Sequence, residues 1–159
     1  MQQQLIIYTD GAARGNPGRG GYGIVLKWGE VHKELSQGFR LTTNNRMELM
    51  AVIVALQQLK KDGLDVTIYS DSSYVVDAVE KGWLNSWIKK GFKDKKNPDL
   101  WMQYAAVASR HKVRFVWVKG HANNAYNNRC DVLATTAADG PNLLIDEGYE
   151  RSQQKGSLL

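Results

Sequence analysis

Apolar and polar positions along the chain form short blocks that predict an ordered series of strands and helices. Short apolar runs between turn residues are typical of β-strands, and they fall at 5–9, 22–28, 31–39, 66–70 and 113–118. Longer stretches with helix start and stop signals predict helices at about 45–61, 73–80, 83–90, 97–110 and 124–138. The helical periodicity is lost after that point, and we expect residues 139–159 to form a largely disordered tail.

The order of these elements predicts an α/β fold built on one five-stranded mixed sheet flanked by helices. The first strands follow one another through short turns and should form an antiparallel meander, whereas helical crossovers to the later strands imply parallel pairing. The stretch 49–56 is apolar on all sides, so the first helix should be buried and central. A length of 159 residues fits a single domain, which we place at 1–138.

Two predicted strands end in nearly the same sequence. "LIIYTDGA" leads to Asp10, and "VTIYSDSS" leads to Asp71. Either aspartate alone is most simply a turn residue. Two of them after matched apolar runs, on strands expected to pair in parallel, should meet at one edge of the sheet, where open α/β sheets bind ligands. Carboxylates brought together repel one another unless a cation joins them.

Two further acidic residues are candidates for the same edge. Glu48 heads an apolar stripe of the buried helix, where a carboxylate needs a partner, although "NRME" is also close to a helix-capping box. Asp131 lies beside the expected core-facing residues of the last predicted helix. Taken alone it favours a surface position, and only its predicted place near the same sheet end makes it a candidate.

Carboxylates without a cluster of cysteine or histidine favour hard cations. The chain has one Cys and three scattered His, so no zinc spacing is present. Oxygen ligands suit Mg²⁺ or Mn²⁺. Two such ions ~4 Å apart can activate a water and stabilise the leaving oxygen in phosphodiester hydrolysis.

The positive charge of the chain is concentrated in one segment. The formal net charge is +5, and residues 81–97 hold six Lys and one Asp, which is also +5, so the rest of the chain balances at 15 basic and 15 acidic residues. This distribution favours a local patch for a polyanion over a generally basic protein, and a solvated lysine-rich loop remains the alternative interpretation. No apolar run reaches the ~20 residues of a membrane span, no leader segment is visible, and the single cysteine suits a reducing cytoplasm.

Several motifs, taken together and in order, resemble one family. They are "YTDGAARGNPGRGGYG", "TTNNRMELMA", "SDSSYVVDAV", "GWLNSWIKKGF", "DLWMQ", "WVKGHA" and "NNRCDVLA". Over about residues 5–138 the chain is similar to bacterial type 1 ribonuclease H. The resemblance implies the ribonuclease H-like fold and a monomeric endoribonuclease that cuts the RNA strand of RNA/DNA hybrids. It also implies catalysis with two Mg²⁺ ions, with Mn²⁺ as a substitute, leaving 3′-hydroxyl and 5′-phosphate ends.

The resemblance assigns roles to individual residues. It implies that the metal-binding, catalytic carboxylates are those of Asp10, Glu48, Asp71 and Asp131. It adds His121 as a catalytic residue assisting proton transfer or product departure, although a histidine in a Gly/Asn loop is usually a plain surface residue.

The resemblance also implies a set of substrate-binding residues, several of which have simpler interpretations. Thr43 and Asn97 would hold a DNA phosphate, with Arg46 nearby, but each lies where a helix cap is expected. The lysines of segment 81–97 would contact DNA phosphates, with an aromatic face against sugar or base, but they could merely keep a loop soluble over core tryptophans. Asparagines near the sheet edge would read RNA 2′-hydroxyls in the minor groove. The full set is Asn16, Thr43, Asn44, Asn45, Arg46, Ser73, Lys81, Trp83, Trp87, Lys89, Lys90, Lys93, Lys95, Lys96 and Asn97.

Two departures and two alternative functions accompany this interpretation. Ser73 stands where the family often has a longer Gln, and the stretch 92–101 is several residues shorter than in well-known bacterial relatives. A different enzyme on the same fold, such as an integrase, resolvase or DNA exonuclease, is one alternative. A hybrid-binding module without catalysis is the other, and four intact carboxylates argue against it.

Overall fold

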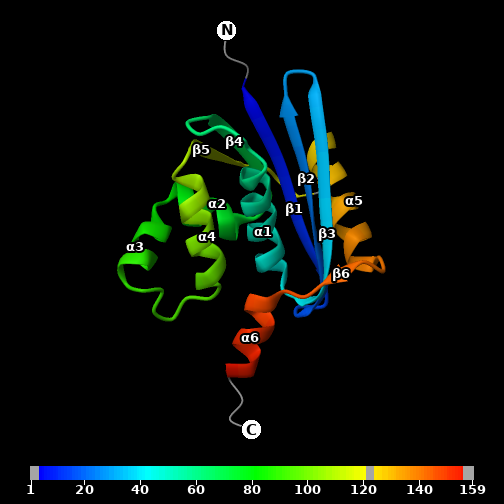
Figure 1. Ribbon diagram of the computed structural model, residues 1–159, viewed down its shortest axis with the longest axis vertical. Coiled ribbons are helices and arrows are strands. Elements are labelled where there is room, and N and C mark those ends of the chain that lie inside the picture. Colours follow the sequence, from blue (N-terminus) through cyan, green and yellow to red (C-terminus); the bar gives the residue numbers. More distant parts are fainter. Residues whose placement is uncertain (1–3, 121–123, 156–159) are drawn as a thin grey trace.

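The computed structural model describes residues 4–120 and 124–155 as strands and helices around one sheet (Figure 1). The strands are β1 (Leu5–Arg14), β2 (Gly18–Trp28), β3 (Val31–Thr42), β4 (Asp65–Ser70), β5 (Lys112–Trp117) and β6 (Leu143–Leu144). The helices are α1 (Asn44–Gln57), α2 (Ser73–Glu80), α3 (Trp83–Lys89), α4 (Pro98–Ala108), α5 (Ala125–Asp139) and α6 (Glu147–Lys155). Within these described residues, none of the helices is both long and apolar enough to span a bilayer.

The sheet has the predicted mixed topology. Its strand order is β5-β4-β1-β2-β3-β6. The β1–β2 and β2–β3 pairs are antiparallel, whereas β1–β4 and β4–β5 are parallel, so the predicted meander and the parallel strands are confirmed. The predicted number of five strands is wrong, because the short β6 adds a sixth strand beside β3.

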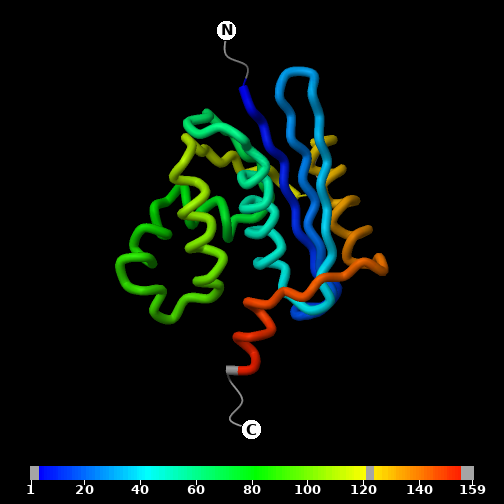
Figure 2. The backbone as a smooth tube through the Cα atoms, viewed as in Figure 1, coloured from blue at the N-terminus to red at the C-terminus, as the bar shows by residue number. Residues whose placement is uncertain are grey.

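Helices cover both faces of the sheet, and the main core lies on the side of α1. Helix α5 packs alone against β1, β2 and β3, while α1 to α4 lie on the other face (Figure 1). Nine residues of α1 are buried, which confirms the prediction of a central helix. Trp101 of α4 is completely buried in the same core. The two ends of the described chain lie far apart, with the start of β1 and α6 at opposite ends of the molecule (Figure 2).

We expected residues 139–159 to form a largely disordered tail, but the structure contains β6 and α6 within residues 140–155. Gly38 and Phe39 of β3 pair with β6, and α6 follows directly. Helix α6 is largely polar, so it carries no apolar stripe that the sequence could have revealed. Long-range ion pairs hold it instead, among them Arg40–Glu150 at 2.8 Å and Arg46–Asp146 at 2.7 Å.

Candidate active site

The repeated strand motif is explained by the register of two neighbouring strands. Tyr8 of β1 lies beside Tyr69 of β4 in a parallel pair. Continuing this register by two residues aligns Asp10 with Asp71. Asp10 does not end its strand as expected, because β1 continues to Arg14 through its pairing with β2, whereas β4 stops at Ser70. The two carboxylates therefore lie where β4 leaves the side of β1.

Glu48 reaches the same place from α1 because the helix passes very close to β1 at Gly11. A Cβ at this position would lie 2.8 Å from the Cβ of Met47 and would also collide with the α1 backbone at Glu48, so only glycine allows this approach. The Gly11 amide donates hydrogen bonds to Asp10 Oδ1 at 2.9 Å and to Glu48 Oε1. One backbone N–H thus holds two carboxylates together. The helix-capping interpretation of Glu48 is not needed, since the Thr43 side chain caps α1.

Three carboxylates form a compact cluster in the part of the chain that the structure describes. Asp10, Glu48 and Asp71 each offer an oxygen, and these oxygens all lie within 4.8 Å of one another. Asp131 of α5 lies outside this trio but lines the same hollow of about 430 Å³. Predicted substrate residues Asn44, Asn45 and Ser73 line it as well.

Burial and mutual repulsion change the acidity of the cluster. Asp10 is 8% exposed and Glu48 is 5% exposed. Burial, with the neighbouring Asp71 and Asp131 carboxylates, raises the pKa of Asp10 to about 7. Burial, with the charges of Asp10 and Asp71, raises the pKa of Glu48 well above its usual range. Without a cation, Asp10 and Glu48 therefore retain protons that exposed carboxyls would have lost.

The donor set fits a hard divalent cation. All groups of the trio are carboxylates that converge on one point from β1, α1 and the end of β4. The only cysteine, Cys130, is buried and its pKa is raised by that burial, so it offers no thiolate. Oxygen ligands of this kind suit Mg²⁺ or Mn²⁺, and a cation would offset the repulsion that keeps the carboxyls protonated.

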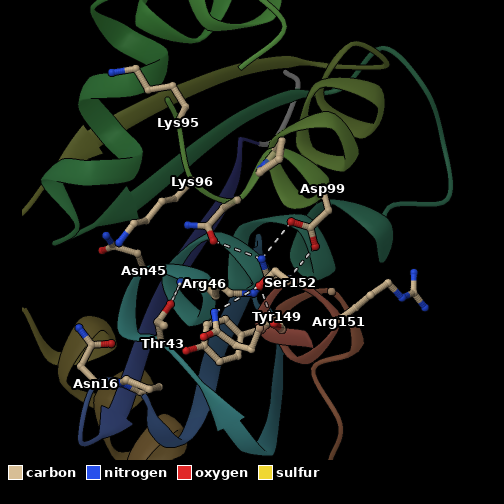
Figure 3. A pocket seen from close by; sticks show the side chains of 15 residues that line it. Asn16, Thr43, Asn45, Arg46, Lys95, Lys96, Asp99, Tyr149, Arg151 and Ser152 are labelled. Carbon is tan, nitrogen blue, oxygen red and sulfur yellow. Dashed lines mark hydrogen bonds and ion pairs between the residues drawn. The ribbon is translucent and has the colours of Figure 1, made fainter. Parts of the chain in front are cut away.

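A second and larger hollow lies beside the carboxylate hollow. This groove of about 800 Å³ is lined by residues from the β1–β2 turn, the start of α1, the lysine segment, the start of α4 and α6 (Figure 3). Seven predicted substrate residues lie along it, namely Asn16, Thr43, Asn45, Arg46, Lys95, Lys96 and Asn97. Asn45 lines both hollows, so they adjoin each other.

The capping interpretations turn out differently for the two predicted phosphate ligands. The Thr43 hydroxyl accepts a hydrogen bond from the Arg46 amide and caps α1. Asn97 precedes α4, but its side chain makes no capping bond. Instead its Nδ2 donates to the Tyr74 hydroxyl at 3.1 Å. The side chain of Asn97 is thus aimed into the groove region and not at its helix.

Arg46 is held by protein acids. Its side chain is 3% exposed and forms ion pairs of 2.7 Å with Asp99 and with Asp146. Its Nη1 also donates to Asn97 Oδ1 at 3.2 Å. These contacts use the donors of the guanidinium, so the structure gives Arg46 a structural role in place of the expected contact with substrate.

The remaining members of the lysine segment lie outside both hollows. Lys81 lies over the ring of Trp83, with its Nζ 5.3 Å from the ring centroid, and Trp83 is 45% exposed. Trp87 packs partly buried against Trp101, which matches the core interpretation for that residue. The other residues that neither hollow includes are Lys89, Lys90 and Lys93.

Comparison with known proteins identifies the family of the chain. A sequence model of the RNase H family matches residues 2–139. Ribonuclease H of Syntrophus aciditrophicus is 55% identical over 93% of this chain and 88% of its own length. Ribonuclease H of Rippkaea orientalis is 53% identical over 93% of each chain. The chain belongs to the ribonuclease H family.

Solved structures agree with this assignment. LC9-RNase H1, described as a type 1 RNase H with the type 2 active-site motif, is 30% identical, with a TM-score of 0.78 over 96% of this chain and 81% of its own. LC11-RNase H1, solved in complex with RNA/DNA hybrid, is also 30% identical, with a TM-score of 0.65 over 86% of this chain and 97% of its own. The resemblance to bacterial type 1 ribonuclease H and the predicted fold are thereby confirmed, and the chain is a nuclease of this family.

One feature of the site lay beyond sequence reasoning. Tyr74 was not predicted, yet its hydroxyl accepts hydrogen bonds from Asn97 Nδ2 and from Trp101 Nε1, the latter at 2.8 Å. A tyrosine in an apolar helix gives no signal of such a role. The predicted catalytic residue His121 lies outside the described residues.

Proposed function

We propose that this protein hydrolyses the RNA strand of RNA/DNA hybrids, using two divalent cations and leaving 3′-hydroxyl and 5′-phosphate ends. The observation that carries the proposal is the convergence of three carboxylates within 4.8 Å in a chain of the ribonuclease H family. Asp10, Glu48, Asp71 and Asp131 would hold the cations, with Mg²⁺ the natural occupant. When bound, such ions promote attack by water and stabilise the leaving oxygen. We further propose that the enzyme is monomeric and cytoplasmic.

The residues around the carboxylates would select and orient the hybrid. Asn44 and Asn45 stand at the wall of the carboxylate hollow, where amides can donate to and accept from RNA 2′-hydroxyls. Asn16 accepts a hydrogen bond from the Asn44 amide at 3.1 Å, so it steadies the start of α1 as well as lining the groove. Ser73 is exposed at the edge of the hollow and is short, so its contact with the hybrid should be weaker than that of a glutamine.

A second group of residues would bind the phosphate backbone away from the reacting bond. Thr43 and Asn97 line the groove next to Lys95 and Lys96, which are suited to a phosphate of the DNA strand. The exposed ring of Trp83 could stack on a sugar or base. His121 would assist proton transfer or product release.

One cleavage assay tests the proposal. Labelled RNA/DNA hybrid, double-stranded RNA and double-stranded DNA are each incubated with and without Mg²⁺. We expect cleavage of the hybrid alone, only with Mg²⁺, and 5′-phosphate product ends. The Asp10→Asn variant should bind the hybrid but fail to cut it.

Other outcomes identify the alternatives. Cutting of double-stranded DNA at a comparable rate would indicate a different enzyme on the same fold. Binding of hybrid without turnover in Mg²⁺ or Mn²⁺ would indicate a binding module. Full activity of Asp10→Asn would refute the assignment of the site.

A further inference from the structure

The last helix of the chain forms one wall of the groove. Five residues of α6 line it, beside the groove residues of the lysine segment and α1 (Figure 3). They are Gly148, Tyr149, Arg151, Ser152 and Gln153. Helix α6 thus supplies five of the fifteen residues that line the groove.

Specific contacts fix α6 in this position. The carboxylate of Asp146, which is 3% exposed, accepts from Arg46 and from the Thr42 hydroxyl at 2.7 Å, and it also caps α6 by accepting from the Tyr149 amide at 3.2 Å. Gly148 packs so closely that a Cβ there would lie 2.8 Å from Arg46 Nη2 and would collide with the Asp99 carboxylate. The buried Asp146 carboxylate and the close packing of Gly148 against the Asp99 and Arg46 side chains make α6 a built part of the wall.

The charges of the groove favour an anionic ligand. Arg46 is neutralised by Asp99 and Asp146. By contrast, Lys95, Lys96 and Arg151 take part in none of the ion pairs found among the described residues. Figure 3 shows the lysines at the upper left of the view and Arg151 at the right, with its side chain extending away from the other labelled residues. Unpaired positive charges spread along the groove and its outer edge are suited to successive phosphates.

The groove is continuous with the carboxylate hollow. Asn45 lines both, so a nucleic-acid duplex held at the carboxylates would bring sugar–phosphate backbone to the entrance of the groove. The uncharged Gln153 amide along the wall can donate to phosphate oxygens without reading sequence, whereas the Ser152 hydroxyl already donates to the Tyr149 carbonyl oxygen at 2.6 Å.

We propose that α6 is part of the nucleic-acid interface, with Arg151 contacting backbone phosphates of the bound hybrid that lie in the groove. This inference rests on the proposed function and deepens it, because it assigns a substrate contact to a residue that lies beyond the matched family region 2–139.

The first test compares the salt dependence of hybrid binding in Arg151→Gln and in a matched control. The control is Lys60→Gln, which removes one positive charge from an exposed residue beyond the far end of α1. The helix separates Lys60 from the groove by about 20 Å, at ~1.5 Å per residue. Binding is measured by fluorescence anisotropy without divalent cation, between 50 and 200 mM salt.

Arg151→Gln should weaken binding at low salt and lower the slope of log K against log salt by about 0.9, the value for one phosphate contact. Between 50 and 200 mM salt, the factor by which the affinity of wild type falls should be about threefold larger than the factor for the variant. Lys60→Gln should keep the wild-type slope and the wild-type kcat for hybrid cleavage. Equal slopes for Arg151→Gln and Lys60→Gln would overturn the inference.

A second variant and a modified substrate separate direct contact from general charge. Gly148→Ala keeps every charge and favours helix, yet it should displace α6 and weaken binding. A hybrid with single methylphosphonate linkages, placed in either the DNA or the RNA strand, should bind Arg151→Gln and wild type equally when the contacted phosphate is the neutral one. The inference would also be overturned if no methylphosphonate position in either strand made the two proteins bind equally and if Gly148→Ala bound hybrid like wild type. If wild type neither binds nor cuts hybrid, the proposed function itself fails, which is a distinguishable result.

Discussion

Replacing Asp10 by asparagine should stabilise the metal-free protein at neutral and alkaline pH. Burial and neighbouring carboxylates raise the pKa of Asp10 from its ordinary value of 3.8 to about 7. The unfolded chain loses this proton near its ordinary pKa, whereas the folded protein holds it up to about pH 7. The folded state therefore binds more protons between these values, and stability is lost as the pH rises through this window.

The size of the effect follows from the shift. A change of roughly three pK units at 1.36 kcal/mol per unit corresponds to about 4 kcal/mol above pH 7. Glu48 and Asp10 repel each other, so the shift does not belong to Asp10 alone. We therefore expect Asp10→Asn to raise the free energy of unfolding by about 2–4 kcal/mol at pH 8 and by much less at pH 5. For a chain of this size the melting temperature should rise by roughly 4–16 °C at pH 8.

The measurement is thermal or urea unfolding of both proteins at pH 5 and pH 8 in a chelator, then at pH 8 with Mg²⁺. The matched control is Asp62→Asn, because Asp62 is exposed and paired with Arg110, so its effect should be small at both pH values. Added Mg²⁺ should stabilise the wild type more than Asp10→Asn, so the difference in stability between the two proteins at pH 8 should become smaller. A difference between wild type and Asp10→Asn that is the same at pH 5 and pH 8 would refute the reasoning.

Four further substitutions test the packing around the site. Arg46→Ala should cost about 3–5 kcal/mol in urea unfolding, because it leaves the buried carboxylate of Asp146 without its partner; a cost below about 1 kcal/mol would contradict this structural role. Gly11→Ala should cost about 1–3 kcal/mol and impair hybrid cleavage, because its methyl group would push α1 away from β1; unaltered cleavage would argue against that close approach. Trp87→Ala should cost about 3 kcal/mol, whereas Trp83→Ala should leave stability within about 0.5 kcal/mol and weaken hybrid binding; equal destabilisation by both would contradict their different burial.

Local sequence patterns were sufficient for the first five strands of the sheet and for three of the carboxylates. Apolar runs marked the strands, and the two matched strand ends marked Asp10 and Asp71 as neighbours, because parallel strands in register deliver equivalent positions to one edge. Glu48 was marked by the apolar stripe it heads. In each case the signal lies within one element, where side-chain periodicity reports burial directly.

The position of Asp10 within its strand required knowledge of pairing. The turn residues after "YTD" predicted a strand end, but the antiparallel partner β2 carries β1 on to Arg14. The different behaviour of Thr43, which caps its helix, and Asn97, which does not, has the same origin. A sequence shows that a residue precedes a helix, whereas only the fold shows whether its side chain turns to that helix or to another element.

The sequence by itself determined the order of the elements, the central helix and three acids that belong together. Only the tertiary structure decided that Arg46 is a buried anchor, that α6 is folded and that both build the groove. The physical reason is that these features depend on ion pairs between residues far apart in the chain. Arg46 pairs with Asp99 and with Asp146. Such pairs leave no periodic trace in the sequence, and a polar helix held by charge has the composition of a disordered tail.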